Sequence, residues 1–426
     1  MDPVIPRSLS AVLLVWGALL LLMFSGRMYS TDVLAQYEVA GSFIGNTPFM
    51  TVSGDYGWIV QGAEAGKYVP HGAGFSLLLV PAAIAGKILG LTAGKVCTAL
   101  TNAVLSLSLV GFWYACARRK YSSLNAGRFL AVAAGSMILV YGKISFDVTA
   151  AAAAAMAGYW FFLGGRNTSA GICMGLALLI RLDSFLLLPL FWKDWKSFRS
   201  LIYGMVPFVL AILFLNWYRF GSPFSDGHSQ DPAVGLAPFR GGIVGLLLSP
   251  GKGLLYYSPL CILALFHQKD WRLWTPFVLS LIFHGMLYDW TGGTGWGPRF
   301  LFTSLPFLLL PLSAGDTGGW VFWTVAALGI AVNVMAVWSN PSILEQTAGA
   351  DLFDAASRQE VIWTYSSSPL FLALRNFGRG IPDMFGAYAA SSAGLPAWTG
   401  ASVQAAAAAV MAWLGFRKLE GASDTA

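Results

Sequence analysis

The sequence predicts an all-α integral membrane protein, built as one polytopic bundle of roughly 11–13 transmembrane helices. Of its 426 residues, 56% are hydrophobic and only 11% are charged, against about 45–50% and about 25% in an ordinary soluble domain. A helix needs about 20 apolar residues to cross a bilayer, and apolar runs near that length recur along the whole chain. This composition excludes a soluble protein and leaves receptors, channels, transporters and membrane enzymes.

The apolar runs follow one another without an internal repeat or a low-complexity linker, so we expect a single domain over residues 1–426. The first run resembles a signal peptide, but no small-residue cleavage pattern follows it, and an uncleaved first helix is expected. In chain order, the runs are Leu9 to Ser25, Phe75 to Leu91, Val96 to Ala117, Phe129 to Phe146, Val148 to Gly164, Ala170 to Trp192, Leu201 to Trp217, Gly251 to Phe266, Trp274 to Leu287, Phe300 to Leu312, Trp320 to Trp338 and Ala401 to Phe416.

Basic residues in short loops indicate which side of the membrane each loop faces, because cytoplasmic loops are enriched in Lys and Arg. The net charge of +6 therefore reports orientation, and a nucleic-acid partner is not implied. Basic clusters fall at alternate boundaries of the second half and are expected inside, at residues 193–199, 269–272 and in the tail 417–426. The expected outer loops are residues 26–74, 218–250, 288–299 and 340–399.

The first half does not orient as simply. Residues 118–120 are all basic, yet two full crossings between residues 75 and 117 would place them outside. Either one segment there is re-entrant or the charge rule fails locally. If the rule holds, Asp147 lies outside, and the run 170–192 must bend back because both of its flanks are basic.

Charged residues inside apolar runs are candidate functional sites, because an unpaired charge in the bilayer costs at least about 2.5–3.5 kcal/mol. Lys143 and Asp147 are four residues apart and could simply pair along one helix face. Arg181 and Asp183 are two apart, and such residues do not face each other on a helix. We therefore expect a cavity-lining or interhelical role for that second pair.

The first outer loop opens with "MYSTDVLAQYEVAGSF", which predicts a helix capped by Ser30 or Thr31 and lying flat on the membrane. Asp32 stands in its first turn, where an acidic residue could merely complement the helix dipole. The loop closes with "GKYVPHGAGFSLLLVP", in which Lys67 and His71 precede glycines that permit close backbone approach.

Three later outer segments, "NWYRFGSPF", "LSPGKGLLYYSP" and "YDWTGGTGWGPRF", combine glycine, aromatic and basic residues. Glycine-rich turns let backbone N–H groups approach an anion, and Lys252 or Arg299 adds a positive charge, so a phosphate site is plausible. None matches the P-loop pattern. Aromatic residues such as Tyr256 are expected at membrane interfaces in any case.

In this order, the strings "YSTD", "GKYVPHGAGFSLLLVP", "LNWYRFGSPF", "LLLSPGKGLLYYSPL" and "WGPRFLFTSLPFLLLPL" resemble the polytopic glycosyltransferases of the GT-C superfamily. The resemblance is to its protein O-mannosyltransferase-like and aminoarabinose-transferase-like members and spans Ser30 to Leu312. It implies a GT-C-like fold and transfer of a sugar from a polyprenyl-phosphate carrier outside the cytoplasm. Their catalytic acid lies in the first outer loop, a position that Asp32 matches. The chain lacks the paired-acid metal motif of the oligosaccharyltransferase branch.

The expected function is therefore transfer of a monosaccharide to a hydroxyl of a protein, lipid or glycan, most simply with inversion. Asp32 is the expected base, no cofactor or metal is expected, and the setting implied is the bacterial inner membrane with the site facing outward. The expected substrate-binding residues are Lys67, His71, Asp147, Arg181, Lys252, Tyr256 and Arg299. A transporter or flippase for a lipid-linked sugar is the alternative, although such proteins more often contain related halves.

Overall fold

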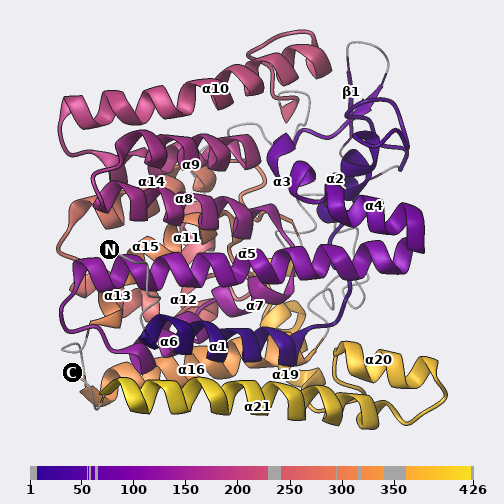
Figure 1. The fold of residues 1–426 in the computed structure, drawn as a ribbon, viewed down its shortest axis with the longest axis vertical. Coiled ribbons are helices and arrows are strands. Elements are labelled where there is room, and N and C mark those ends of the chain that lie inside the picture. The colour runs from indigo at the N-terminus through magenta and orange to yellow at the C-terminus, as the bar shows by residue number, and fades with distance from the viewer. Residues whose placement is uncertain are drawn as a thin grey trace.

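The computed structural model describes residues 7–54, 56, 59–62, 66–228, 241–293, 295–314, 319–339 and 361–423. Within these ranges the chain is almost entirely helical, and its sheet is one short antiparallel pair, β1 (Val60–Gln61) and β2 (Lys67–Tyr68). The long helices lie side by side in one bundle. The strand β1 and the short helices near it in sequence lie together at one end of this bundle (Figure 1).

Four of the described helices are long and apolar enough to cross a membrane on their own. They are α5 (Leu91–Lys120), α10 (Trp195–Phe220), α16 (Gly319–Trp338) and α21 (Ala397–Ser423). The first helix, α1 (Arg7–Met23), packs along α21, where Gly17 contacts Met411 and Gly415 contacts Val15. The last helix thus lies beside the first at the edge of the bundle (Figure 1).

The other apolar runs fold as shorter helices separated by breaks. Proline lacks a backbone N–H, and Pro259, Pro306 and Pro311 stand at three of these breaks. The segments are α6 (Ala126–Ala134), α7 (Ile138–Lys143), α8 (Asp147–Leu163), α9 (Asn167–Ile180), η1 (Leu182–Phe191), α11 (Gly242–Leu248), α12 (Leu254–Tyr257), α13 (Leu260–His267), α14 (Trp271–Gly285), η4 (Arg299–Ser304), α15 (Leu305–Leu309) and η5 (Leu310–Ser313).

The expected first outer loop contains α2 (Thr31–Ser42), and the run after it forms two short helices, α3 (Ala73–Leu78) and α4 (Val80–Leu89). Neither is long enough to cross a bilayer of about 30 Å at 1.5 Å per residue. Of the two alternatives for residues 75–117, the structure therefore favours a first segment that does not cross fully, and α5 is the one helix of this region that is long enough to span a membrane.

With a single long helix in this region, the basic residues 118–120 at the end of α5 can lie on the cytoplasmic side that the charge rule predicts. Lys120 forms an ion pair with Asp270 at 2.8 Å, just before α14, and the Arg119 guanidinium lies 4.1 Å from the ring of Trp160 near the end of α8. The basic residues at these helix ends therefore share one end of the bundle, as the charge rule requires.

The expected bend in the run 170–192 is confirmed. The backbone of Arg181 is extended, between α9 and the 3₁₀ helix η1. Gly171 of α9 contacts Leu201 of α10, and Gly175 contacts Phe208, so α9 and α10 run parallel. The η1 segment must therefore return the chain to the end where α9 began.

The long outer loop expected at residues 340–399 is partly described. Residues 340–360 lie outside the described ranges, and the rest forms η6 (Tyr365–Ser367), α19 (Pro369–Asn376), α20 (Phe385–Ser392) and the start of α21.

The pairing of Lys143 with Asp147 is wrong. Because α7 ends at Lys143 and Phe146 is extended, the two residues do not share a helix face. Lys143 is buried and forms an ion pair with Asp383 at 2.8 Å, and it also donates to the carbonyls of Asp383 and Val337. This cluster anchors the segment before α20 to the bundle.

Candidate functional site

The helix α2 presents Asp32 and Gln36 to the bundle on one face, since residues four apart are neighbours on a helix. The Ser30 side chain caps the helix and accepts a hydrogen bond from the backbone N–H of Asp32 at 3.1 Å. The predicted helix and its cap are therefore confirmed. Gln36 is buried, and only 16% of the Asp32 side chain is exposed.

Asp32 forms an ion pair with Arg299, the first residue of η4, with 2.5 Å between Oδ2 and Nη1. The Arg299 guanidinium also lies 4.8 Å from the centre of the Phe146 ring. Burial alone would raise the pKa of the Asp32 carboxyl, but Arg299 and then His71 hold it below its usual value. Asp32 is therefore an ionised carboxylate at neutral pH.

Arg299 retains hydrogen-bonding capacity beyond this pair. Its Nε is buried and has no hydrogen-bond partner among the described residues. A guanidinium presents five N–H donors in a planar fork that matches phosphate oxygens. The side chain can therefore hold an anion in addition to Asp32, or in exchange for it.

A second ionic chain begins at Asp147, in the first turn of α8. Its Oδ1 accepts from Arg181 at 3.0 Å, and Arg181 also binds Asp183 through two N–H groups at 2.8 and 3.1 Å. His284 of α14 continues the chain, with Nε2 at 3.2 Å from Asp183 and Nδ1 at 2.9 Å from the carbonyl of Ser280. Arg181 and Asp183 also pair with each other, because the helix is interrupted at Arg181, and their bonds to Asp147 of α8 and His284 of α14 confirm the expected interhelical role.

Aromatic side chains connect the Asp32–Arg299 pair to the ionic chain that begins at Asp147. The His284 ring stacks on Phe300 with 4.7 Å between centroids and an angle of 14°. Phe300 directly follows Arg299, whose guanidinium lies 4.8 Å from the centre of the Phe146 ring and 5.7 Å from the centre of the Phe300 ring. Three carboxylates, two guanidiniums and one imidazole therefore form one cluster that joins α2, α8, η1, α14 and η4.

His71 lies beside this cluster, just before α3. Arg219 of α10 donates from Nη1 to the carbonyls of Val69 and His71 at 2.8 and 2.9 Å, which fixes the loop. The backbone of Gly72 packs so tightly on Ile180 that a Cβ would lie 2.4 Å from its carbonyl oxygen, which is the close approach expected from the glycines. Burial lowers the pKa of His71 from 6.5 to about 4, although Asp32 acts in the opposite direction.

Lys252 and Tyr141 support the loop that carries Arg299. Lys252 is fully buried, and its ammonium group donates to the carbonyl of Gly295. The Tyr141 hydroxyl donates to the carbonyl of Trp296 at 3.0 Å. Lys252 therefore does not bond the Arg299 side chain but supports the backbone of the loop that precedes it.

Two other predicted residues lie outside the cluster. Lys67 is exposed on β2. The Tyr256 hydroxyl is 3.1 Å from the hydroxyl of Tyr365, at the surface. No hydrogen bond or ion pair of the described residues connects either side chain to the Asp32 or Asp147 groups.

His284, Gln36 and Arg219 were not among the predicted site residues, and Asp183 was predicted only as an embedded charge with a cavity-lining or interhelical role. His284 and Asp183 stand inside apolar runs, and an ionisable residue at such a position signals function by default. Gln36 follows Asp32 by four residues on the same helix. Arg219 lies in the predicted segment "NWYRFGSPF", but its partners lie about 150 residues away in sequence, so the local pattern did not reveal its role.

No cluster of three or more His, Cys, Asp or Glu side chains that could hold a metal ion occurs among the described residues. The carboxylates of the cluster are instead neutralised by arginine.

Comparison with known proteins gives a match in structure alone. No family model and no curated protein sequence matches the chain. Two solved structures of ArnT from Cupriavidus metallidurans do match, one bound to undecaprenyl phosphate and one in the apo state, with TM-scores of 0.55 and 0.53. Sequence identity is 16% and 15%, and each match covers 96% of this chain and 75% of ArnT. The chain is therefore an all-α integral membrane protein whose fold is similar to that of ArnT.

Proposed function

We propose that this protein is a glycosyltransferase that moves a monosaccharide from a polyprenyl-phosphate carrier to a hydroxyl of a protein, lipid or glycan. The observation that carries the proposal is the part-buried Asp32–Arg299 pair, in which the Arg299 Nε–H has no hydrogen-bond partner among the described residues. The pair places a base beside a phosphate-binding group, which is what this reaction needs. The fold supports the proposal, since ArnT has been solved with undecaprenyl phosphate bound.

The geometry supports an exchange of partners at Arg299. When the lipid phosphate binds, its oxygens compete with Asp32 for the guanidinium, and the unfilled Nε offers a second contact. Asp32 is then free to accept the proton of the acceptor hydroxyl. The acceptor oxygen attacks the anomeric carbon, the bond from that carbon to the phosphate oxygen breaks, and polyprenyl phosphate leaves with the electron pair.

Asp147 is poorly placed to act as a second nucleophile. Arg181 binds one of its oxygens at 3.0 Å and the Gln36 amide donates to the other at 3.4 Å. Retention would ordinarily need a free second carboxylate near the anomeric carbon. We therefore propose inversion, with Asp147 and Arg181 shaping the site, His71 beside it and Lys252 supporting the Arg299 loop. We propose that Lys67 and Tyr256 contact the headgroup or the polyprenyl tail of the carrier lipid.

We propose that the site faces outward from a bacterial inner membrane. Basic residues concentrate at the end of the bundle opposite the cluster, including Lys120 and Arg272, which both bind Asp270. Cysteines placed singly at residues 67 and 193 should therefore react with a membrane-impermeant reagent from opposite sides. Labelling of residue 67 only after permeabilisation would contradict this orientation.

The direct test uses purified protein with undecaprenyl-phosphate sugars carrying labelled glucose, mannose, galactose or arabinose, and cell-envelope extract as the acceptor. We expect transfer of label from at least one of these lipids, without added metal, and none from nucleotide sugars. Movement of the labelled lipid across vesicles without transfer would favour a flippase. Complete loss of transfer with a chelator would contradict the metal-free reaction.

A further inference from the structure

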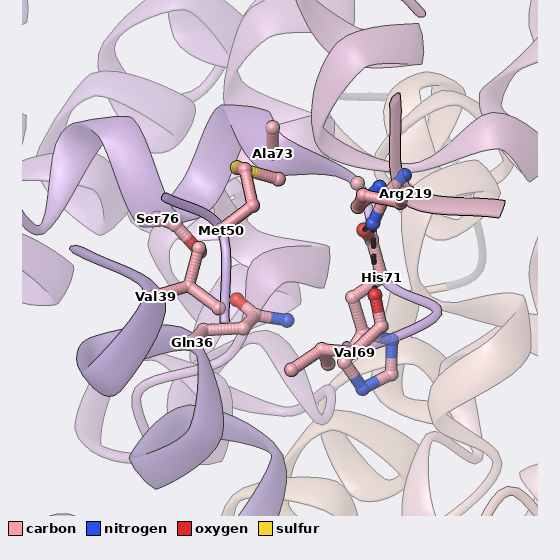
Figure 2. Close-up of a pocket in the computed structure, with 9 residues that line it drawn as sticks. Gln36, Val39, Met50, Val69, His71, Ala73, Ser76 and Arg219 are labelled. Carbon is pink, nitrogen blue, oxygen red and sulfur yellow. Dashed lines mark hydrogen bonds between the residues drawn. The ribbon is translucent and has the colours of Figure 1, made fainter. Parts of the chain in front are cut away.

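A small cavity lies next to the cluster, between α2, the loop before α3 and the end of α10. Its polar lining consists of Gln36, Ser76, His71 and Arg219, and its volume is about 10 Å³. That volume is enough for one water molecule or one hydroxyl group. In Figure 2 the amide of Gln36 projects into this space, between Ser76 on one side and His71 on the other.

The cavity contains a buried hydrogen-bond acceptor without a partner. Gln36 is only 2% exposed, and its Oε1 has no hydrogen-bond partner among the described residues. Its Nε2 donates to Asp147 at 3.4 Å. Turning the amide over would place its oxygen against the carboxylate, which has no proton to offer. The oxygen must therefore face the cavity, where burial without a hydrogen bond is costly.

The lining restricts the chemistry of whatever fills the cavity. The occupant must donate a hydrogen bond to Gln36, and the Ser76 hydroxyl can serve as a second partner because it both donates and accepts. A cation would be repelled by the positive charge of Arg219, which also lines the cavity. An anion would meet the Gln36 oxygen and the Asp147 carboxylate behind it. A neutral O–H group satisfies all of these conditions.

We propose that this cavity is a binding site for one neutral hydroxyl, filled by a water molecule in the free protein and by a hydroxyl of the transferred sugar in the complex. The second half of the proposal rests on the proposed glycosyltransferase function. Because Gln36 bonds both the cavity occupant and Asp147, it is a positioning and specificity-determining residue. A sugar with a hydroxyl at the right carbon would displace the water and keep the Gln36 amide aligned.

The water arm is tested without any assay of activity. A crystal or electron-microscopy structure of the wild-type protein, at a resolution that shows ordered waters, should contain one within hydrogen-bonding distance of Gln36 Oε1. The Gln36→Leu variant, determined in the same way, should lack it. A dry cavity in the wild type would overturn the proposal.

The sugar arm uses the undecaprenyl-phosphate sugar that the enzyme accepts, together with its monodeoxy analogues. One neutral hydrogen bond corresponds to about a 2- to 10-fold change, so one analogue should lose about that much kcat/KM in the wild type. This loss should vanish in Gln36→Leu, because the partner is already absent. It should persist in the control Gln268→Leu, at the opposite end of the bundle.

Equal losses in Gln36→Leu and the wild type would overturn the sugar arm and leave a resident water. Absence of transfer from every lipid would instead contradict the proposed function. In that case the presence or absence of the ordered water would still test whether the cavity binds a hydroxyl. Failure of the cavity proposal can therefore be told apart from failure of the proposed function.

Discussion

Two buried ionic clusters begin four residues apart, at Lys143 and at Asp147, and they differ in how completely their hydrogen bonds are satisfied. Lys143 has three acceptors for its three N–H donors, at 2.6 to 2.8 Å. Its partner Asp383 also accepts from Tyr29 and Tyr388 at 2.6 Å. The cluster around Asp147 and Arg299 leaves the Arg299 Nε and the Gln36 Oε1 without partners among the described residues.

This difference separates structural stabilisation from ligand binding. A saturated buried ion pair has nothing left to offer a ligand, and its removal should affect only stability. An unsaturated cluster carries the cost of unpaired groups, which a ligand can relieve on binding. The comparison therefore predicts opposite outcomes for substitutions in the two clusters.

The largest effect is expected for Asp32→Asn, which should lower the rate of transfer by about 10²–10⁴-fold, the typical contribution of a positioned base. Asparagine keeps the size of the side chain and can still accept a hydrogen bond from Arg299, but it removes the negative charge that Arg299 pairs with, so some loss of stability should accompany the loss of rate. The measurement compares transfer rates at equal folded concentration. Asp194→Asn, at the exposed N-cap of α10, is the control. A variant that retained more than about a tenth of the wild-type rate would assign Asp32 a structural role.

In the saturated cluster, Lys143→Met should reduce the free energy of unfolding by about 3–5 kcal/mol, because it leaves Asp383 buried without its cation. Transfer per folded molecule should stay at the wild-type level. Thermal or denaturant unfolding in a membrane mimetic measures the first quantity. Lys120→Met breaks the more exposed pair with Asp270 and should cost only about 0–1 kcal/mol. A selective loss of activity in Lys143→Met would contradict the division between the clusters.

Arg299→Lys should weaken binding of the sugar-donor lipid by roughly 10- to 100-fold, which corresponds to one charge-assisted contact of about 1.5–3 kcal/mol. Lysine keeps the positive charge beside Asp32 but loses the planar fork that grips phosphate. Titration of the protein with undecaprenyl phosphate measures the affinity. Arg272→Lys, which also faces an aspartate but at the opposite end, should bind as the wild type does. Equal affinity in both variants would remove Arg299 from the phosphate site.

The sequence predicts what depends on local pattern. The apolar runs predict the helical membrane fold, and Ser30 before Asp32 predicts the cap of α2. The basic residues on both sides of the run 170–192 predict that the chain reverses direction near Arg181. The order of the motifs along the chain predicts a fold like that of ArnT, which the structure has. These inferences need only neighbouring residues or the order of segments along the chain.

What the sequence does not predict are partners separated by many residues. Lys143 has a nearby acidic residue in the sequence, yet it pairs with Asp383, 240 positions away, because α7 ends at Lys143. Arg299 and Asp32 are 267 positions apart. Hydropathy and spacing carry no information about which of several buried charges will meet, since this depends on helix breaks and packing.

A further expected effect is a pH dependence of stability caused by His71, next to the unsaturated cluster. Burial lowers its pKa in the folded protein from 6.5 to about 4. Between these two values the unfolded chain binds more protons than the folded one, so the free energy of unfolding should rise as the pH rises through this window. The contribution is complete above pH 6.5 and is lost as the pH falls toward 4.

Unfolding of the wild type and of His71→Gln, followed from pH 7.5 to pH 4.5, should therefore show a steeper loss of stability in the wild type over this range. His267→Gln, on the helix end opposite the cluster, should keep the wild-type slope. Parallel slopes in the wild type and His71→Gln would mean that the imidazole is hydrated and titrates normally. His71 would then lie in open contact with solvent, and the cluster beside it could not be the dry, preorganised site that phosphate exchange at Arg299 requires.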